Sequence, residues 1–167
     1  MTGLLTSGDP RAARCPRRSE ADARLLSELV LFVRIHQAGR PGLLWPEHAG
    51  PDGWDRPPGD LADALALRLG RPVTALPAPA LPAPARPAAE PAAAPYDLLV
   101  LQQGGSSGWQ LLPPARPAAG TAARGAGPEL RLRAGEVLYV PGGYAMRCRP
   151  ARESRDIRLA LGLPTRP

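Results

Sequence analysis

Several residue types are rare or missing in this chain, and each absence excludes a class of structure or of binding site. Neither Lys nor Asn occurs, so every one of the 21 basic residues is Arg. Aromatic residues make up only 4% of the chain, which limits the hydrophobic core although 44% of the residues are hydrophobic. The two cysteines, Cys15 and Cys148, are far apart in the sequence, so we expect neither a disulfide framework nor a cysteine-rich zinc site.

Long hydrophobic runs are also missing. No run approaches the length of a membrane-spanning helix, and the N-terminal 18 residues lack the apolar segment of a signal peptide. We therefore predict a cytoplasmic protein without a membrane partner. The 167 residues suit one domain with a core of its own rather than two domains.

The remaining composition is basic and rich in Ala, Gly, Pro and Arg. The formal net charge is +6, which favours an anionic partner such as nucleic acid. Lys and Asn have AT-rich codons, whereas the four abundant residues have GC-rich codons. A GC-rich gene therefore explains part of the positive charge without any nucleic acid.

The N-terminal part of the chain carries a helix signal. Ser19 and Asp22 have the spacing of a capping box, and leucines at helical spacing follow them. The apolar run over 29–33 could continue the helix, but its β-branched residues favour a strand that ends near Gly39.

A second helix is predicted further along. Gly and Pro describe a loop over 41–58, after which Asp60 can cap a helix that ends at Gly70. A short strand is expected over 73–76. The dense prolines of 77–95 cannot join a central sheet and favour a stiff polyproline II connection.

The C-terminal half has the pattern of a β protein. Gly and Pro turns separate its short apolar or alternating segments, which is typical of a β-sandwich or a jelly roll. Strands are expected over 98–101, 109–112, 130–133, 137–140 and 157–161.

A spaced motif lies within this β-like region. It runs from Asp97 through an apolar stretch to Gln102, and then to Gly105 and Trp109. This motif resembles the central motif of the JmjC/cupin-4 family, which includes the ribosomal oxygenases. Two later blocks also resemble that family: residues 132–143, and the closing strand over 157–163.

The resemblance covers about residues 60–163. It implies a mainly β, cupin or jelly-roll fold, a double-stranded β-helix with one or two N-terminal helices. The corresponding division of the chain is a disordered leader over 1–18, a helical and strand-containing first part of the barrel domain over 19–76, the Ala/Pro-rich connection over 77–95, the cupin/JmjC-like core over 96–163 and a tail over 164–167.

The resemblance also implies an iron site whose ligands have been replaced. Family members hold Fe(II) with a His, an acidic residue two positions later and a distal His, and leave positions open for 2-oxoglutarate and oxygen. These three positions correspond to Ala92, Ala94 and Met146, and the basic residue that binds 2-oxoglutarate corresponds to Ser107. We therefore predict no catalytic residues, no metal and no cofactor.

A protein with this scaffold and without these ligands is predicted to be non-catalytic. We expect it to bind a small molecule, a peptide or a protein partner in the former oxygenase cleft. The candidate cleft residues are aromatic, because aromatic rings at a barrel mouth can stack on a ligand; the alternative is that they fill the core. They are Tyr96, Trp109, Tyr139 and Tyr144.

Two other functions stay open. An Fe(II)/2-oxoglutarate-type oxygenase with displaced ligands would need His36 or His48, the only histidines, together with Asp97, Glu136 or Cys148. An RNA- or ribosome-associated protein would need one continuous arginine face. Candidates for that face are the arginines at 11, 14, 17, 18, 147, 149, 152, 155 and 158.

Overall fold

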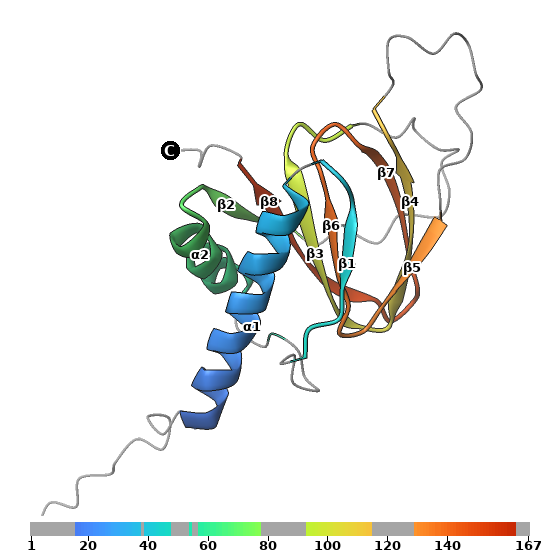
Figure 1. The fold of residues 1–167 in the computed structure, drawn as a ribbon. Helices are drawn as coiled ribbons and strands as arrows, with labels where there is room; N and C mark the ends of the chain where they lie inside the picture. Colours follow the sequence, from blue (N-terminus) through green and yellow to red (C-terminus); the bar gives the residue numbers. More distant parts are fainter. Residues whose placement is uncertain are drawn as a thin grey trace, which may run out of the picture.

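The computed structural model describes residues 16–37, 39–47, 54, 57–77, 93–114 and 129–162. Two helices precede most of the strands, and the strands form two antiparallel sheets that face each other (Figure 1). The predicted class, mainly β with N-terminal helices, is confirmed. The elements are α1 (Pro16–His36), β1 (Gly42–Leu44), α2 (Pro58–Leu69), β2 (Val73–Leu76), β3 (Asp97–Gly104), β4 (Ser106–Leu112), β5 (Glu129–Arg133), β6 (Val137–Val140), β7 (Ala145–Pro150) and β8 (Arg155–Leu161).

After β3, the chain crosses between the two sheets several times, so that neighbouring strands in the sequence often belong to different sheets. One sheet has the strand order β1-β6-β3-β8-β2 and the other has the order β5-β4-β7. The turn from β3 into β4 needs glycine at Gly105, which has φ 63°. A Cβ atom there would lie 2.7 Å from the carbonyl oxygen of Glu153. The glycine of the spaced motif therefore lets the chain cross between the sheets.

Strand β3 lies at the centre of the larger sheet and is apolar on both faces. Its odd-numbered leucines, Leu99 and Leu101, pack in a helix-side core against α1 and α2. Leu98 and Val100 point the other way, into an inter-sheet core that faces the three-stranded sheet. A strand covered on both faces loses the apolar–polar alternation, which explains the continuous apolar run in the sequence.

Helix α1 differs from the prediction at both ends. It begins at Pro16, so residues 16–18 of the expected leader are helical, and residues 1–15 lie outside the described residues. It also continues to His36, so the strand predicted to end near Gly39 is wrong. Leu29 and Val33 are four residues apart and both fully buried against the sheet. This packing outweighs the modest β preference of branched residues.

Helix α2 ends at the predicted residue but begins differently. Gly70 adopts φ 67° and its N–H donates to the carbonyl of Ala66. Pro57 occupies the N-cap position instead of Asp60, which lies in the first turn and makes no capping bond. A carboxylate there still complements the positive end of the helix dipole.

The predicted strands are confirmed with small changes at their ends, and two further strands were missed. Strand β1 lies within the predicted loop over 41–58, and it pairs with β6 at the edge of the larger sheet. Strand β7 pairs with β4. Most of the Ala/Pro-rich connection, residues 78–92, lies outside the described residues. No helix of the described ranges is long and apolar enough to cross a membrane.

Helix α1 provides a test of the helix-side core. Leu29 is fully buried, whereas Leu31 is 61% exposed on the opposite side of the same helix. We expect Leu29→Ala to lower the free energy of unfolding by about 2–5 kcal/mol, through lost burial and the cavity that remains. Leu31→Ala should change it by less than about 0.5 kcal/mol. Urea unfolding of both variants measures the difference, and equal losses would contradict this assignment of the helix faces.

Candidate functional site

Two of the three positions that the resemblance assigns to iron ligands are described, and both lie beside the inter-sheet core. Met146 is on β7, and its thioether packs against that core. Ala94 lies next to β7, because its carbonyl accepts a 2.7 Å hydrogen bond from the N–H of Gly143. Ala92 is outside the described residues. A methyl group has no lone pair to donate, and a thioether is a soft ligand for Fe(II). These residues do not fit an iron ion.

Ser107, which the sequence resemblance assigns to the cosubstrate position, belongs to a closed hydrogen-bond network. It is 1% exposed. Its hydroxyl donates to Oε1 of Gln102 at 2.6 Å and accepts from Nε1 of Trp109 at 2.9 Å. The amide nitrogen of Gln102 donates to Ser154 and to the carbonyls of Gly104 and Arg155. The retained motif residues thus satisfy each other, and the serine has no donor left for a ligand.

A partly buried ion pair lies near this network. Nη2 of Arg158 contacts Oδ2 of Asp156 at 2.8 Å and also donates to Sγ of Cys148 at 3.3 Å. The guanidinium carbon lies 5.1 Å from the centre of the Trp109 ring. Burial raises the pKa of the Cys148 thiol, and the Arg158 charge opposes this only in part. A protonated thiol is a poor nucleophile, so the cysteine acts here as a packing residue.

The four aromatic residues proposed for a cleft do not lie together. Trp109 is almost fully buried in the inter-sheet core, and Tyr96 and Tyr144 pack partly buried against it. Tyr139 is fully buried on the opposite face of the five-stranded sheet, in the helix-side core. Three of the four therefore help fill the space between the sheets, and the fourth is separated from them by the sheet.

Tyr139 and Asp97 form a structural network on the helix side. The Tyr139 hydroxyl donates to Oδ2 of Asp97 at 2.8 Å, and Arg71 contacts the same oxygen at 3.2 Å. The N–H of Gly142 donates to the other carboxylate oxygen at 2.9 Å. Burial, reinforced by the bond to Asp97, raises the pKa of Tyr139 far above its usual range. The motif aspartate thus connects three segments.

The residues considered for a displaced metal site are spread over separate places. His36 ends α1 instead of following a strand, and its half-buried ring lies 4.7 Å from the Phe32 ring on the helix side. The Glu136 carboxylate accepts from Nε1 of Trp45 and from the N–H of Arg133. His48 is outside the described residues. Within the described part, no three His, Cys, Asp or Glu side chains form a group that could hold a metal.

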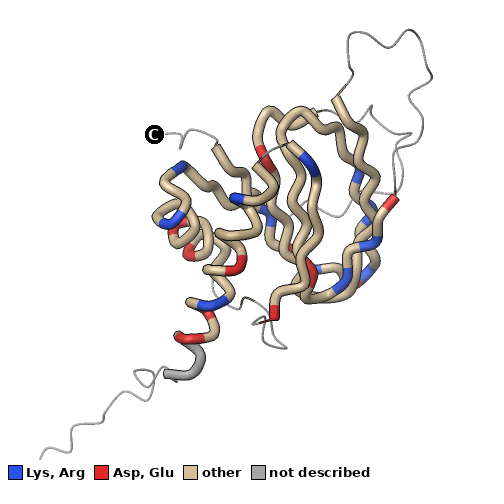
Figure 2. The backbone as a smooth tube through the Cα atoms, viewed as in Figure 1, with Lys and Arg blue, Asp and Glu red and all other residues tan. Residues whose placement is uncertain are grey.

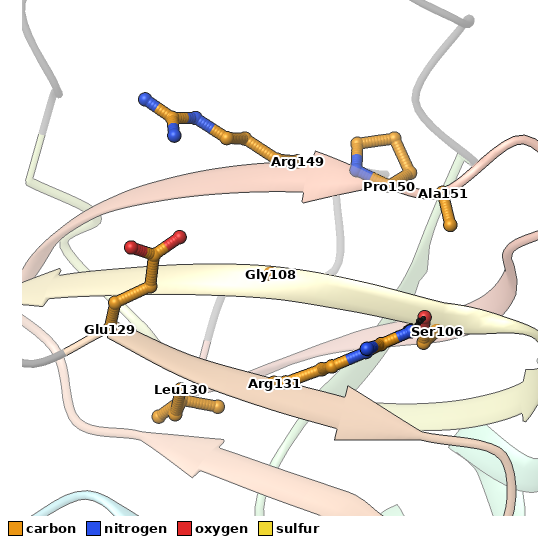
Figure 3. Close-up of a pocket in the computed structure, with 8 residues that line it drawn as sticks. All are labelled: Ser106, Gly108, Glu129, Leu130, Arg131, Arg149, Pro150 and Ala151. Carbon is orange, nitrogen blue, oxygen red and sulfur yellow. Dashed lines mark hydrogen bonds between the residues drawn. The ribbon is translucent and has the colours of Figure 1, made fainter.

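The larger described hollow lies on the outer face of the three-stranded sheet. Its volume is about 360 Å³, and Gly108 of β4 leaves its floor without a side chain (Figure 3). Arg131 and Glu129 come from β5, and Arg149 comes from β7. We call this hollow the Gly108 groove. Sequence reasoning named Arg149 among many arginines and missed the groove, because only strand pairing brings β5 and β7 to the two sides of Gly108.

Comparison with known proteins gives distant structural likenesses. No model of a protein family matches the chain, and no curated protein sequence matches it. YcfD of E. coli matches at 19% identity and a TM-score of 0.36, over 46% of this chain and 23% of that chain. YcfD, described as a ribosomal oxygenase and complexed with cobalt and 2-oxoglutarate, matches at 20% identity and 0.36, over 46% and 20%. The match thus spans about a fifth of those chains, and the fold class rests on the sheets and helices described above.

Removing the Ser107 hydroxyl tests the closed network. Ser107→Ala leaves the buried Trp109 N–H without its acceptor and removes a donor to Gln102. We expect the free energy of unfolding to fall by about 1–3 kcal/mol. Ser106→Ala, which removes only two exposed hydrogen bonds from Arg131, is the matched control and should cost less than about 0.5 kcal/mol. Chemical denaturation of the two variants measures this, and a neutral Ser107→Ala would show that the network is not closed.

Alkaline titration tests the Tyr139 environment. The folded-state pKa is raised, so the stabilisation is complete below the unfolded pKa of about 10 and is lost as the pH rises above it. We expect the Tyr139 phenol to ionise only as alkali unfolds the chain. Tyrosinate absorbance followed together with circular dichroism should show this late step, and Tyr139→Phe should remove it. Ionisation of Tyr139 in the folded state near its ordinary pKa would contradict the assignment.

Proposed function

We propose that this protein is a non-catalytic, cupin/JmjC-like protein that acts by binding a small molecule, a peptide or a protein partner. The observation that carries the proposal is the closed bonding of Ser107 with Gln102 and Trp109. An oxygenase of this class needs a charged clamp and open polar positions in the barrel for its cosubstrate. The residues that the resemblance assigns to the clamp and to the distal ligand are the fully bonded Ser107 and the apolar Met146, which supports the proposal.

The charges in the barrel support the same proposal. The guanidinium of Arg158 is the charged donor nearest to Trp109 among the described contacts, and Asp156 already neutralises it. A buried, paired arginine would have to give up its partner before it could bind an anionic cosubstrate, and breaking such a pair is costly. Arg158 is therefore a poor substitute for the missing clamp.

The alternative of an oxygenase with displaced ligands receives little support from His36. The ring lies on the helix side of the five-stranded sheet, where it packs against Phe32 and Tyr139. Gly42 is so close that a Cβ atom there would lie 2.4 Å from the ring. A side chain held in this way faces away from the barrel interior.

Binding therefore belongs to the surface of the protein rather than to the space between the sheets. That space is filled by the side chains of the inter-sheet core, including Leu111, Met146 and Tyr144. The Gly108 groove is open to solvent and is lined by charged side chains. It is the part of the described surface best suited to a partner.

Reconstitution with iron tests the proposal. We expect protein incubated anaerobically with Fe(II) to retain far less than one metal ion per chain by mass spectrometry, and to form no succinate from 2-oxoglutarate. Fe(II) and 2-oxoglutarate together should also leave thermal unfolding unchanged, whereas a ligand at a hundred times its Kd would add about 2.7 kcal/mol of stability.

Retention of iron would argue against the proposal. Stoichiometric iron with 2-oxoglutarate turnover would overturn the proposal. Loss of that iron in His36→Ala or in His48→Ala would then identify the displaced ligand, and each variant serves as the control for the other.

A further inference from the structure

Strand pairing places two arginines on opposite sides of a glycine. Gly108 of the central strand β4 pairs with Arg131 of β5 and with Arg149 of β7. Residues directly opposite each other in a sheet point to the same face, so both side chains stand on the outer face. Neighbouring strands are about 4.8 Å apart, which sets the two arginine Cα atoms about 10 Å apart across the bare Gly108 floor.

The outer face around the groove is strongly positive. Gln110 of β4 pairs with Glu129 and Arg147, and Ser106 pairs with Arg133. The face therefore carries four arginines, at 131, 133, 147 and 149, and one acidic residue, Glu129. Figure 2 shows this predominance of basic residues on β5 and β7. Such a face complements an acidic partner.

Arg131 is already oriented for binding. Its Nε and Nη2 atoms both donate to the Ser106 hydroxyl, at 3.3 and 3.0 Å. Figure 3 shows the side chain extending along the groove toward Ser106, with Glu129 at the other end. The Nε–Nη2 edge is one that binds a carboxylate through two parallel hydrogen bonds. A carboxylate offers two acceptor oxygens to this edge, whereas the serine offers one.

We propose that the Gly108 groove binds an acidic peptide segment of a partner protein, with its carboxylates on Arg131 and Arg149. This inference rests on the proposed function, because it names the partner class of a protein that acts by binding. Glu129 supports a peptide in particular. Its carboxylate lies close to the groove floor, since a Cβ atom on Gly108 would be 3.7 Å from Oε1. It can accept hydrogen bonds from peptide N–H groups.

RNA fits the groove less well than a peptide. Single-stranded RNA is usually bound by aromatic rings on which bases stack, beside arginines that contact phosphates. Trp109, Tyr96 and Tyr144 of this region pack into or against the inter-sheet core instead of the outer face. Glu129 would also repel the phosphates of an RNA strand lying in the groove.

A binding titration with a defined probe tests the proposal. The probe is a short fluorescent peptide of alternating Glu and Ser, compared with the same peptide carrying Gln in place of Glu. We expect the acidic peptide alone to bind at low salt, and its affinity to fall as NaCl is raised. Replacing both arginines, Arg131→Gln with Arg149→Gln, should weaken binding about tenfold. Fluorescence anisotropy measures all of these affinities.

Three matched variants separate the groove from overall charge. Arg24→Gln with Arg40→Gln makes the same charge change at exposed positions outside the groove and should leave the affinity unchanged. Glu129→Gln keeps an amide oxygen that can accept from a peptide N–H and removes the charge that repels the carboxylates of the probe, so it should strengthen binding of the acidic peptide several-fold. Gly108→Ile keeps every charge and fills the groove floor; no neighbour lies within 3.4 Å of the added Cβ, so the fold should persist while binding is lost.

Each contrary outcome identifies what has failed. Equal losses in the two double arginine variants, or equal binding of the Gln peptide, would reduce the effect to non-specific charge and overturn the proposal. Tighter binding of an oligouridylate of the same length through Arg131 and Arg149 would replace the peptide with RNA. Iron-dependent turnover of 2-oxoglutarate would instead refute the non-catalytic function while leaving the groove measurements valid, so the two failures are distinguishable.

Discussion

Burial of both faces of the five-stranded sheet is the constraint on which the rest of the structure depends. Leu99 and Leu101 of β3 pack against the helices, while Leu98 and Val100 pack against the second sheet. Because no face of β3 is left for solvent, α1 must cover one side and the three-stranded sheet must cover the other. The barrel interior is consequently a core, and a ligand inside it would have to displace packed side chains.

Several polar residues inside that core bond to each other. Gln102, Ser107 and Trp109 form a closed network, and Arg158 is paired with Asp156. Buried polar groups without partners are expensive, so this mutual bonding stabilises the space between the two sheets. The motif residues Gln102, Gly105 and Trp109 thus serve packing and turn formation in this fold.

On the outer face of the three-stranded sheet, strand pairing and not burial determines where the side chains lie. Its side chains face solvent, and the pairing of β4 with β5 and β7 sets the distances between them. Arg131 and Arg149 are distant in sequence, yet both pair with Gly108. Neither arginine carries a local sequence signal that distinguishes it from the other arginines of this chain, so the groove follows from the strand register alone.

Local sequence patterns were sufficient to predict the elements that depend on interactions between residues close in the sequence. The stop of α2 at Gly70, most strands of the C-terminal half and the mainly β class could be predicted, because turn residues and apolar alternation act over a few neighbours. Tertiary packing decided the rest: it kept residues 29–33 helical, placed Tyr139 and Trp109 on opposite faces of one sheet, closed the Ser107 network and formed the Gly108 groove. These features depend on contacts between segments far apart in the chain, whose register no local pattern specifies.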